Sequence, residues 1–86
     1  MNKLIILNPI DNVATVLTDI NSGETISNDN LNVTAVELIE KYHKIALKDI
    51  PEGEYCYKYG NVIGVATKDI SAGQHVHTHN IQSVNS

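Results

Sequence analysis

Arginine, phenylalanine and tryptophan are absent from this 86-residue chain, and cysteine and methionine each occur once. Six lysines stand against ten acidic residues, so the formal net charge is −4. Nucleic acids and anionic membranes are bound by clustered positive charge, which makes both of them poor partners for this chain. The lone cysteine, Cys56, excludes an internal disulfide. A secreted domain of this size without a disulfide would be unusual, so we expect a cytoplasmic protein.

Long apolar runs are missing as well. The longest, from Leu4 to Leu7, is far too short to cross a bilayer, and the first residues lack the longer apolar stretch of a signal peptide. A chain of 86 residues has the size of one domain and leaves little room for a deep pocket beside its core. If the chain takes part in catalysis, we therefore expect it to share its site with another chain.

What the sequence does contain favours β-structure. Apolar residues make up 42% of it, and the aliphatic ones are rich in isoleucine and valine, whose branched side chains pack well in strands. One pattern, Asp-Ile-x-x-Gly followed by a polar residue, occurs at 19–24, 49–54 and 69–74. Asp bonds to nearby backbone and Gly adopts a positive φ, so each passage predicts a tight turn that leads into a strand.

The remaining pattern predicts the other elements. Strands are expected at residues 3–7, 13–17, 42–47, 55–59, 62–66 and 74–80, and a loop at 27–32. Thr34 and Glu37 match a capping box, which predicts one short helix of about two to three turns. The sequence thus predicts a mainly β fold: a compact, turn-rich antiparallel domain over residues 1–80, with one short helix and a polar tail over 81–86.

Histidine is the most informative residue type. His75, His77 and His79 alternate, so on a strand their side chains would form a row on one face. Neutral imidazole binds iron or zinc and transfers protons near neutral pH, which makes this row a candidate site. Successive members of the row start about 6–7 Å apart, so three cannot all reach one ion unless the strand distorts. The solvated face of an edge strand explains the pattern equally well, and His43, taken alone, is typical of a partly exposed residue.

The aromatic residues indicate packing rather than chemistry. Tyr55, Tyr57 and Tyr59 alternate along one expected strand. In a domain without Phe or Trp we interpret them as its large core and interface side chains. Cys56 has no Cys-x-x-Cys partner and no adjacent basic cluster, which indicates a packed or surface thiol rather than a nucleophile.

Several blocks of the sequence resemble one family. They are Asp-Asn-Val-Ala at 11–14, His-Lys-Ile-Ala-Leu-Lys-Asp-Ile at 43–50, Gly-Glu at 53–54, Lys-Tyr-Gly at 58–60, Ile-Gly-x-Ala-Thr-x-Asp-Ile at 63–70 and Gly-x-His-Val-His-x-His-Asn at 73–80. In this order they resemble the SAF-type domain of the altronate and galactarate dehydratases, over residues 8–80. Two positions depart from the family pattern: Tyr42 stands where glycine is frequent, and Cys56 where valine or isoleucine is frequent.

The resemblance implies a β-clip fold and the role of a free-standing small subunit, similar to those of altronate dehydratase and sulfolactate sulfo-lyase. Such a subunit completes the active site of a separate large catalytic subunit. The family reaction is a β-elimination from a hydroxy acid, and the lyase depends on a divalent metal, typically iron(II). The resemblance therefore implies a metal cofactor and a protein partner.

The resemblance also implies roles for individual residues. They are proton transfer by His43, His75 and His77, metal binding by His75, His77 and His79, and substrate binding by Lys44 and Asn80. Which histidine is base, acid or ligand stays open. Two other functions also stay open: a stand-alone, non-catalytic module that binds an acidic carbohydrate or a metal, and a structural subunit whose histidine face packs on the large chain.

Overall fold

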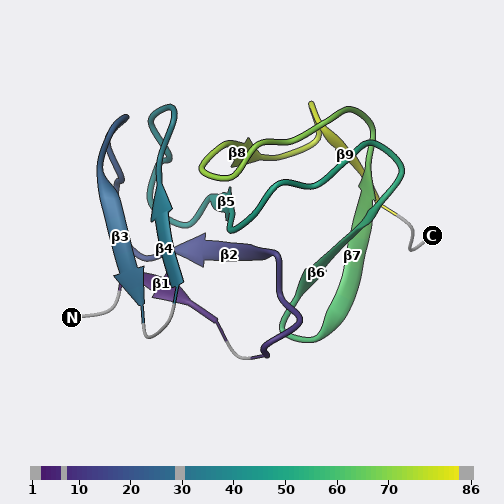
Figure 1. Ribbon diagram of the computed structural model, residues 1–86, viewed down its shortest axis with the longest axis horizontal. Helices are drawn as coiled ribbons and strands as arrows, with labels where there is room; N and C mark the ends of the chain where they lie inside the picture. The colour runs from purple at the N-terminus through teal and green to yellow at the C-terminus, as the bar shows by residue number, and fades with distance from the viewer. Residues whose placement is uncertain (1–2, 7, 29–30, 84–86) are drawn as a thin grey trace.

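The computed structural model describes residues 3–6, 8–28 and 31–83, and it shows them in nine strands without a helix (Figure 1). The strands are β1 (Leu4–Ile5), β2 (Val13–Val16), β3 (Thr25–Asn28), β4 (Leu31–Thr34), β5 (Lys44–Ala46), β6 (Tyr55–Lys58), β7 (Asn61–Ala66), β8 (His75–Val76) and β9 (Ile81–Gln82). Their pairings are antiparallel. The mainly β fold class is therefore confirmed, and it agrees with a small β-clip domain.

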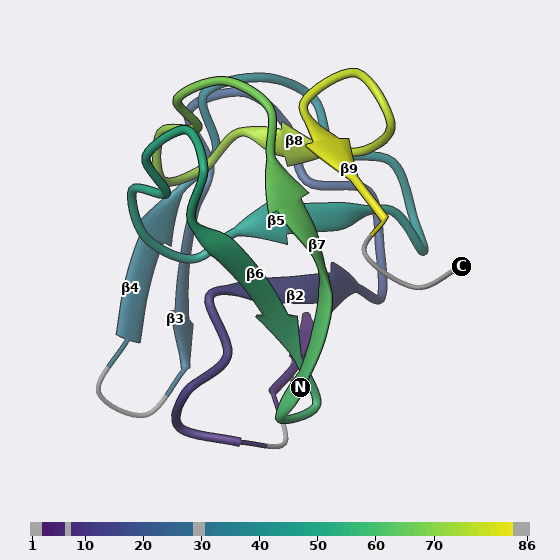
Figure 2. The ribbon, with the colours of Figure 1, turned by 90° about the vertical axis from the view of Figure 1, so that its right-hand side faces the viewer.

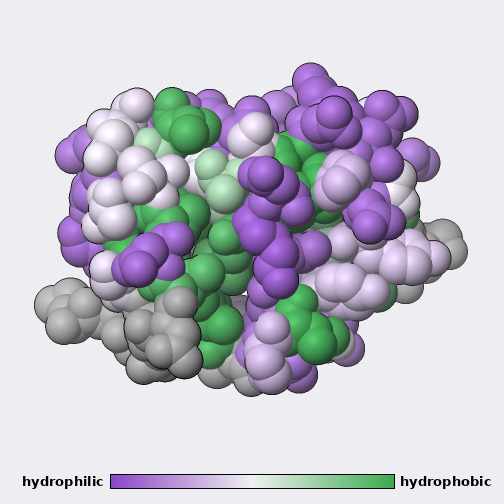
Figure 3. Space-filling view, viewed as in Figure 1, coloured by the Kyte–Doolittle hydropathy of each residue, from purple (hydrophilic) through white to green (hydrophobic). Residues whose placement is uncertain are grey.

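Three sheets build the molecule. A four-stranded sheet in the order β1-β2-β5-β8 lies in the middle, with the β3–β4 hairpin at one end and a sheet in the order β6-β7-β9 at the other (Figure 1). Viewed from the second end, β6 and β7 cross in front of β2 and β5 (Figure 2). On the face drawn in Figure 3, hydrophilic residues predominate and apolar residues reach the surface in separate patches.

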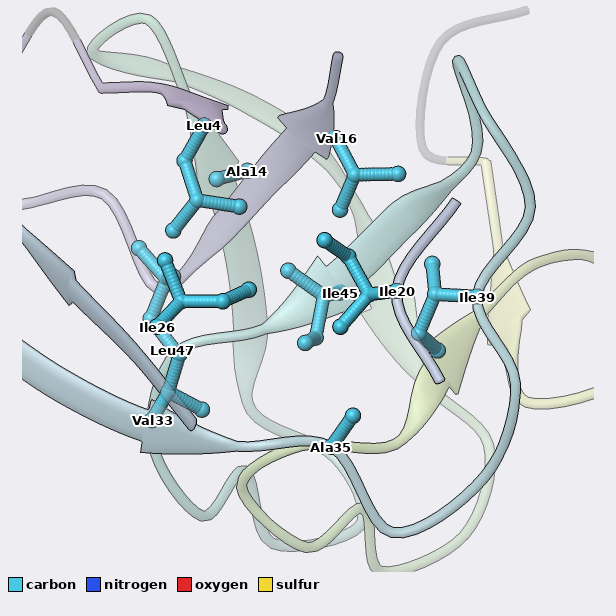
Figure 4. Packing of buried hydrophobic residues seen from close by; sticks show 10 residues of the cluster. All are labelled: Leu4, Ala14, Val16, Ile20, Ile26, Val33, Ala35, Ile39, Ile45 and Leu47. Carbon is cyan, nitrogen blue, oxygen red and sulfur yellow. The ribbon is translucent and has the colours of Figure 1, made fainter. Parts of the chain in front are cut away.

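Two apolar clusters lie on opposite sides of the middle sheet. In β5, Ile45 belongs to the first cluster and Ala46 to the second, because neighbouring side chains of a strand point to opposite faces. The first cluster lies between the sheet and the β3–β4 hairpin, and Figure 4 shows Ile20 and Ile39 packed beside Ile45 in it. The second cluster contains residues of β6 and β7. The middle sheet is thus buried on both faces by its own chain.

Four turns of one design connect the strands. The three expected turns, at 19–24, 49–54 and 69–74, are confirmed, and a fourth lies at 38–43; we call these four the clip turns. In each clip turn the last residue donates its backbone N–H to the carbonyl oxygen three positions earlier, at 2.9 or 3.0 Å. The residue before it has a positive φ, between 71° and 90°. The sequence pattern did not predict the fourth turn, because Tyr42 stands at the position where the other three turns have glycine.

The clip turns are joined in pairs. Ile20 and Ile39 exchange two backbone hydrogen bonds of 2.8 Å, and Ile50 and Ile70 exchange two bonds of the same length. The chain therefore follows one path twice: strand, clip turn, hairpin, clip turn, strand. The two passes share β5, where the first ends and the second begins.

The short helix expected from the capping box is wrong. β4 ends at Thr34, after which the Ala35 N–H donates to the Glu24 carbonyl oxygen at 2.9 Å and the Val36 N–H to the Gly73 carbonyl oxygen at 3.0 Å. The Ala35 carbonyl oxygen also accepts the Gly23 N–H at 2.7 Å, and the Ile39 N–H donates to the Ile20 carbonyl oxygen at 2.8 Å. A helix capped at Thr34 would instead join the Ile39 N–H to the Ala35 carbonyl oxygen. Pairing with distant segments therefore overrides the local capping signal.

Three further segments differ from expectation. Residues 27–28 and 31–32 belong to β3 and β4, where Ser27 pairs with Asn32, instead of to a loop. The strand expected at 74–80 is reduced to β8, and residues 81–82 of the expected tail form β9, which pairs with β7. Residues 29–30 and 84–86 lie outside the described residues.

The tyrosines of β6 do not fill the core. Cys56 faces the second cluster and is fully buried, and burial raises the pKa of its thiol, which confirms a packed cysteine. Tyr55 is 53% exposed, and Tyr57 and Tyr59 are half-buried. The fully buried residue of this alternation is therefore the small thiol, and the three tyrosines are not core residues; their place in an interface stays a prediction.

Candidate functional site

A turn at residues 77–80 shapes the histidine-rich segment. Asn80 is 2% exposed: its Nδ2 donates to the His75 carbonyl oxygen at 2.8 Å, and its Oδ1 accepts from the His77 backbone N–H at 2.9 Å. The Asn80 backbone N–H donates to the His77 carbonyl oxygen at 3.0 Å. The chain therefore turns directly after β8. The row of histidines expected on one strand face is wrong, because the turn places the His79 ring beside that of His75.

Four imidazole rings form one group, which we call the histidine cluster (His43, His75, His77 and His79). The ring centroid of His75 lies 4.9 Å from that of His43, 5.7 Å from that of His77 and 5.4 Å from that of His79. The rings of His75 and His77 are stacked, with 12° between their planes. His43 Nδ1 and His75 Nε2 are 2.9 Å apart, a hydrogen bond in which one ring donates and the other accepts. His75 is therefore the centre of the cluster.

Strand pairing explains how His43 joins the cluster. β5 and β8 are antiparallel neighbours, with Lys44 opposite Val76. His43 directly precedes Lys44, and His77 directly follows Val76, so their rings meet at one end of the strand pair with centroids 5.9 Å apart. His43 is partly exposed, as expected of it taken alone, but it is not separate from the other histidines, because its ring belongs to the histidine cluster.

The surroundings of His75 favour its neutral form. Burial lowers the pKa of His75, the charges of His43 and His79 lower it further, and Glu37 acts in the opposite direction. Glu37 Oε2 also accepts a hydrogen bond from the His75 backbone N–H at 3.0 Å. A neutral imidazole can accept a proton or bind a metal ion, so His75 is in the required form for either task.

The histidine cluster fits a metal ion only in part. Two ring nitrogens, on His43 and His75, lie close together. The described part of the chain holds no group of three or more histidine, cysteine, aspartate or glutamate side chains placed to bind a metal ion. A catalytic zinc site, for comparison, has three protein ligands and a structural zinc site has four. The described residues therefore do not complete a metal centre by themselves.

Two lysines without an acidic partner among the described residues meet on the opposite face of β5 from His75, because Lys44 pairs with Val76 whereas His75 pairs with Ile45. Lys44 is half-buried and pairs with Thr15 of β2, and Lys58 Nζ donates to Thr15 Oγ1 at 3.5 Å. Burial lowers the pKa of Lys44, and the charge of Lys58 lowers it further. Among residues 3–6, 8–28 and 31–83, neither lysine forms an ion pair with a carboxylate. An anionic group placed here would relieve the repulsion between the two lysines.

The structure therefore brings most of the predicted site residues to one end of β5 and β8. Asn80 is close to the histidines, but both of its polar side-chain groups bond to the backbone, so it positions the loop, and its contact with substrate stays a prediction. Sequence reasoning missed Glu37, which was interpreted as part of a helix cap. It also missed Lys58, whose place beside Thr15 depends on the packing of β6 against β2.

Comparison with known proteins points to one family. Residues 2–84 match the family model described as the altronate/galactarate dehydratase SAF domain. The chain is similar to an altronate dehydratase of Escherichia coli, with 44% identity over 77 residues, which make up 90% of this chain and 16% of that protein. It is 39% identical over 83 residues, 96% of its length, to an altronate dehydratase of Bacillus subtilis, of which it covers 17%.

A shorter relative is also similar. The (2R)-sulfolactate sulfo-lyase subunit alpha of Paracoccus pantotrophus is 39% identical over 59 residues, which make up 69% of this chain and 88% of that subunit. The chain thus spans about a sixth of the altronate dehydratases and most of the sulfo-lyase subunit. Within the residues that the structure describes, no helix is long and apolar enough to cross a membrane.

Proposed function

Because this chain belongs to the altronate/galactarate dehydratase SAF-domain family, we propose that it is the small subunit of a metal-dependent hydro-lyase. It completes the active site of a separate large subunit and is inactive without it. The reaction is a β-elimination from a sugar acid or a related hydroxy acid. The similarity to a sulfo-lyase subunit alpha, 88% of which is covered by the match, supports the small-subunit role. The observation that carries the proposal is the meeting of four imidazole rings around His75.

The proposed chemistry needs a base and an acid close together. The base removes the proton on the carbon next to the carboxylate, the electron pair forms the double bond, and the C–O bond breaks as the hydroxyl leaves with a proton from the acid. His43, His75 and His77 are the proposed proton-transfer groups. The hydrogen bond between His43 and His75 lets a proton held at one ring be shared with the other. Burial lowers the pKa of His75 and so favours the unprotonated ring that a base or a metal ligand requires.

We propose iron(II) as the divalent metal. His75, His77 and His79 are the ligands that this chain would offer, and the large subunit would supply the rest, since the described residues form no three-ligand group alone. When bound, the metal would polarise the leaving hydroxyl group as a Lewis acid.

The uncompensated lysines suit an acidic substrate. Lys44, with Lys58 beside it, is the proposed partner of the substrate carboxylate, because an anion there offsets the repulsion between the two side chains. Asn80 holds the backbone of the histidine loop in place and is the second proposed substrate contact. We place the assembly in the cytoplasm, in keeping with the unpaired, buried Cys56. The net charge of −4 offers no support for nucleic acid or membrane partners.

The test begins with the tagged chain expressed in its native cell and with the identity of the proteins that co-purify. We expect an equimolar, larger dehydratase-like chain. With ferrous iron, the pair is expected to eliminate water or sulfite from one of altronate, galactarate or sulfolactate, whereas this chain alone is expected to be inactive. Recovery of this chain alone, with binding of an acidic sugar or a metal, would contradict the proposal and favour a stand-alone binding module.

Within the active pair, His77→Ala tests the histidine cluster. We expect kcat to fall about 10²-fold or more, because a proton-transfer group contributes about 10²–10⁴ to a rate. His77 is exposed, so the variant is expected to fold and to assemble as before. Lys68→Ala, an exposed side chain outside the cluster, is the control. Unchanged kcat would contradict the role of His77, and lost assembly with normal kcat per assembled pair would favour a structural subunit.

A further inference from the structure

One clip turn differs from the other three at the position that needs a positive φ. Glycine occupies it at Gly23, Gly53 and Gly73, with φ between 87° and 90°. In the clip turn 38–43 the residue is Tyr42, with φ of 71°. A side chain is disfavoured in this left-handed region, and such strain in a non-glycine residue persists mostly where it serves a function.

The same clip turn differs at its first position. Asp19, Asp49 and Asp69 each accept, through Oδ1, a backbone N–H from the clip turn paired with their own, at 2.8 or 2.9 Å. Leu38 stands at the equivalent position and has no side-chain acceptor for that bond. In this turn Leu38 therefore stands in place of aspartate and Tyr42 in place of glycine, and both are larger than the residues that suit these positions.

Neither replacement buries the new side chain. Leu38 is 53% exposed and Tyr42 67%, and Val36, just before the turn, is 54% exposed. These are three of the five large apolar side chains that stand exposed in the described part of the chain. The Tyr42 ring lies 4.9 Å from Lys41 Nζ, measured to the ring centroid, and the described residues do not enclose it in a core.

The segment also belongs to the rim of the histidine cluster. It ends at His43, and Glu37, between two of the exposed residues, accepts the backbone N–H of His75. The exposed apolar side chains are therefore tied to the same backbone that positions the proposed proton-transfer groups. A partner that contacts them would lie against the open side of the cluster.

We infer that Val36, Leu38 and Tyr42 form the docking surface for the large catalytic chain, an inference that rests on the proposed function. About five-sixths of the matched altronate dehydratases lies outside the segment that this chain covers, so the remainder is a partner of sufficient size. Tyrosine and apolar side chains are typical of the buried centre of an interface. The described residues hold no group of three metal-binding side chains, so a large chain docked at this rim would also be placed to supply the ligands that the cluster lacks.

The test restores the residues that the protein itself uses in its other clip turns. Leu38→Asp, Tyr42→Gly and the double variant are compared with the matched control Ile10→Asp, which changes a 50% exposed residue outside the clip turns. In the reconstituted pair, each single variant is expected to weaken Kd about tenfold and the double variant more. The unfolding midpoint of the free chain is expected not to fall, since aspartate and glycine suit these positions. Ile10→Asp is expected to leave Kd unchanged.

The outcomes separate this inference from the proposed function. If the pair assembles and the double variant binds as tightly as the native chain, the docking surface is overturned while the small-subunit role stands. If the native chain binds no large chain, both are overturned. If the surface instead joins two copies of this chain, sedimentation shows a dimer that Leu38→Asp dissociates, and the large chain is overturned as occupant. Hydrogen exchange that slows at residues 36–42 on assembly, and not elsewhere on the clip turns, would support the inference independently.

Discussion

The two pairs of clip turns share one backbone and differ in their side chains. In the pair formed by 49–54 and 69–74, each turn has a glycine at the positive φ and an aspartate that bonds the partner turn. In the pair formed by 19–24 and 38–43, one turn keeps both features and the other has neither. Both pairs nevertheless keep the same central bridge. The turn 38–43 therefore keeps its backbone geometry without the aspartate and the glycine, and its two exposed apolar side chains are not needed for the bridge.

The largest expected effect distinguishes glycines that look alike in the sequence. A Cβ at Gly73 would lie 1.9 Å from the Thr34 carbonyl oxygen, whereas a Cβ at Gly53 meets nothing within 4 Å. We expect Gly73→Ala to lower the free energy of unfolding by about 3 kcal/mol, from the clash together with the backbone strain. Gly53→Ala is expected to cost about 0.5–1 kcal/mol, because about 1–2 kcal/mol of strain is partly offset by the lower conformational entropy of alanine in the unfolded chain. Chemical denaturation of both variants measures the difference, and equal losses would show that close packing at Gly73 does not matter.

A smaller effect is expected from the aspartates. Asp69→Ala removes the acceptor of the Glu52 N–H and is expected to cost about 1 kcal/mol. Leu38→Asp adds the corresponding acceptor opposite Ser22 and is expected to gain about 0.5 kcal/mol, because the carboxylate is exposed. Urea midpoints of the two variants give both values. A lower midpoint for Leu38→Asp would mean that the two pairs are not equivalent at this position.

The smallest effect is expected at Tyr42. Tyr42→Gly relieves about 1–2 kcal/mol of left-handed strain and adds about 0.5–1 kcal/mol of glycine entropy, so the net gain is expected to be about 0.5 kcal/mol. Thermal unfolding of the free chain measures it. A loss of more than about 1 kcal/mol would show that the tyrosine ring stabilises the free chain, contrary to its exposure.

These turns also show what the sequence could predict. The three turns with both Asp and Gly were recognised because their local chemistry is sufficient. The turn at Tyr42 was not, since its geometry is imposed by the bridge between Ile20 and Ile39, which are distant in sequence. For the same reason the capping box at Thr34 predicted a helix where the backbone pairs with remote segments.

The histidine cluster, too, could be predicted from the sequence only in part. The alternation of histidines was visible, but the turn that places the His79 ring beside that of His75 depends on the buried side chain of Asn80. His43 lies next to His75 because β5 pairs with β8. Sequence periodicity describes one strand at a time. It could therefore indicate histidine as the residue type of the site, but not which residues lie together in it. The family resemblance named the residues, and the fold gave the reason that they meet.

The strand β5 has a consequence for how the molecule melts. It is three residues long, and Ile45 and Ala46, both fully buried, belong to different clusters. If β5 leaves the sheet, both clusters lose a buried residue at the same time. The two passes of the chain are therefore coupled through this one short strand. We expect a single cooperative transition, in which Cys56 becomes open to alkylation at the same denaturant concentration at which the first cluster loses its structure. A substitution that unfolds either pass of the chain would then also separate the rings of the histidine cluster at the end of β5.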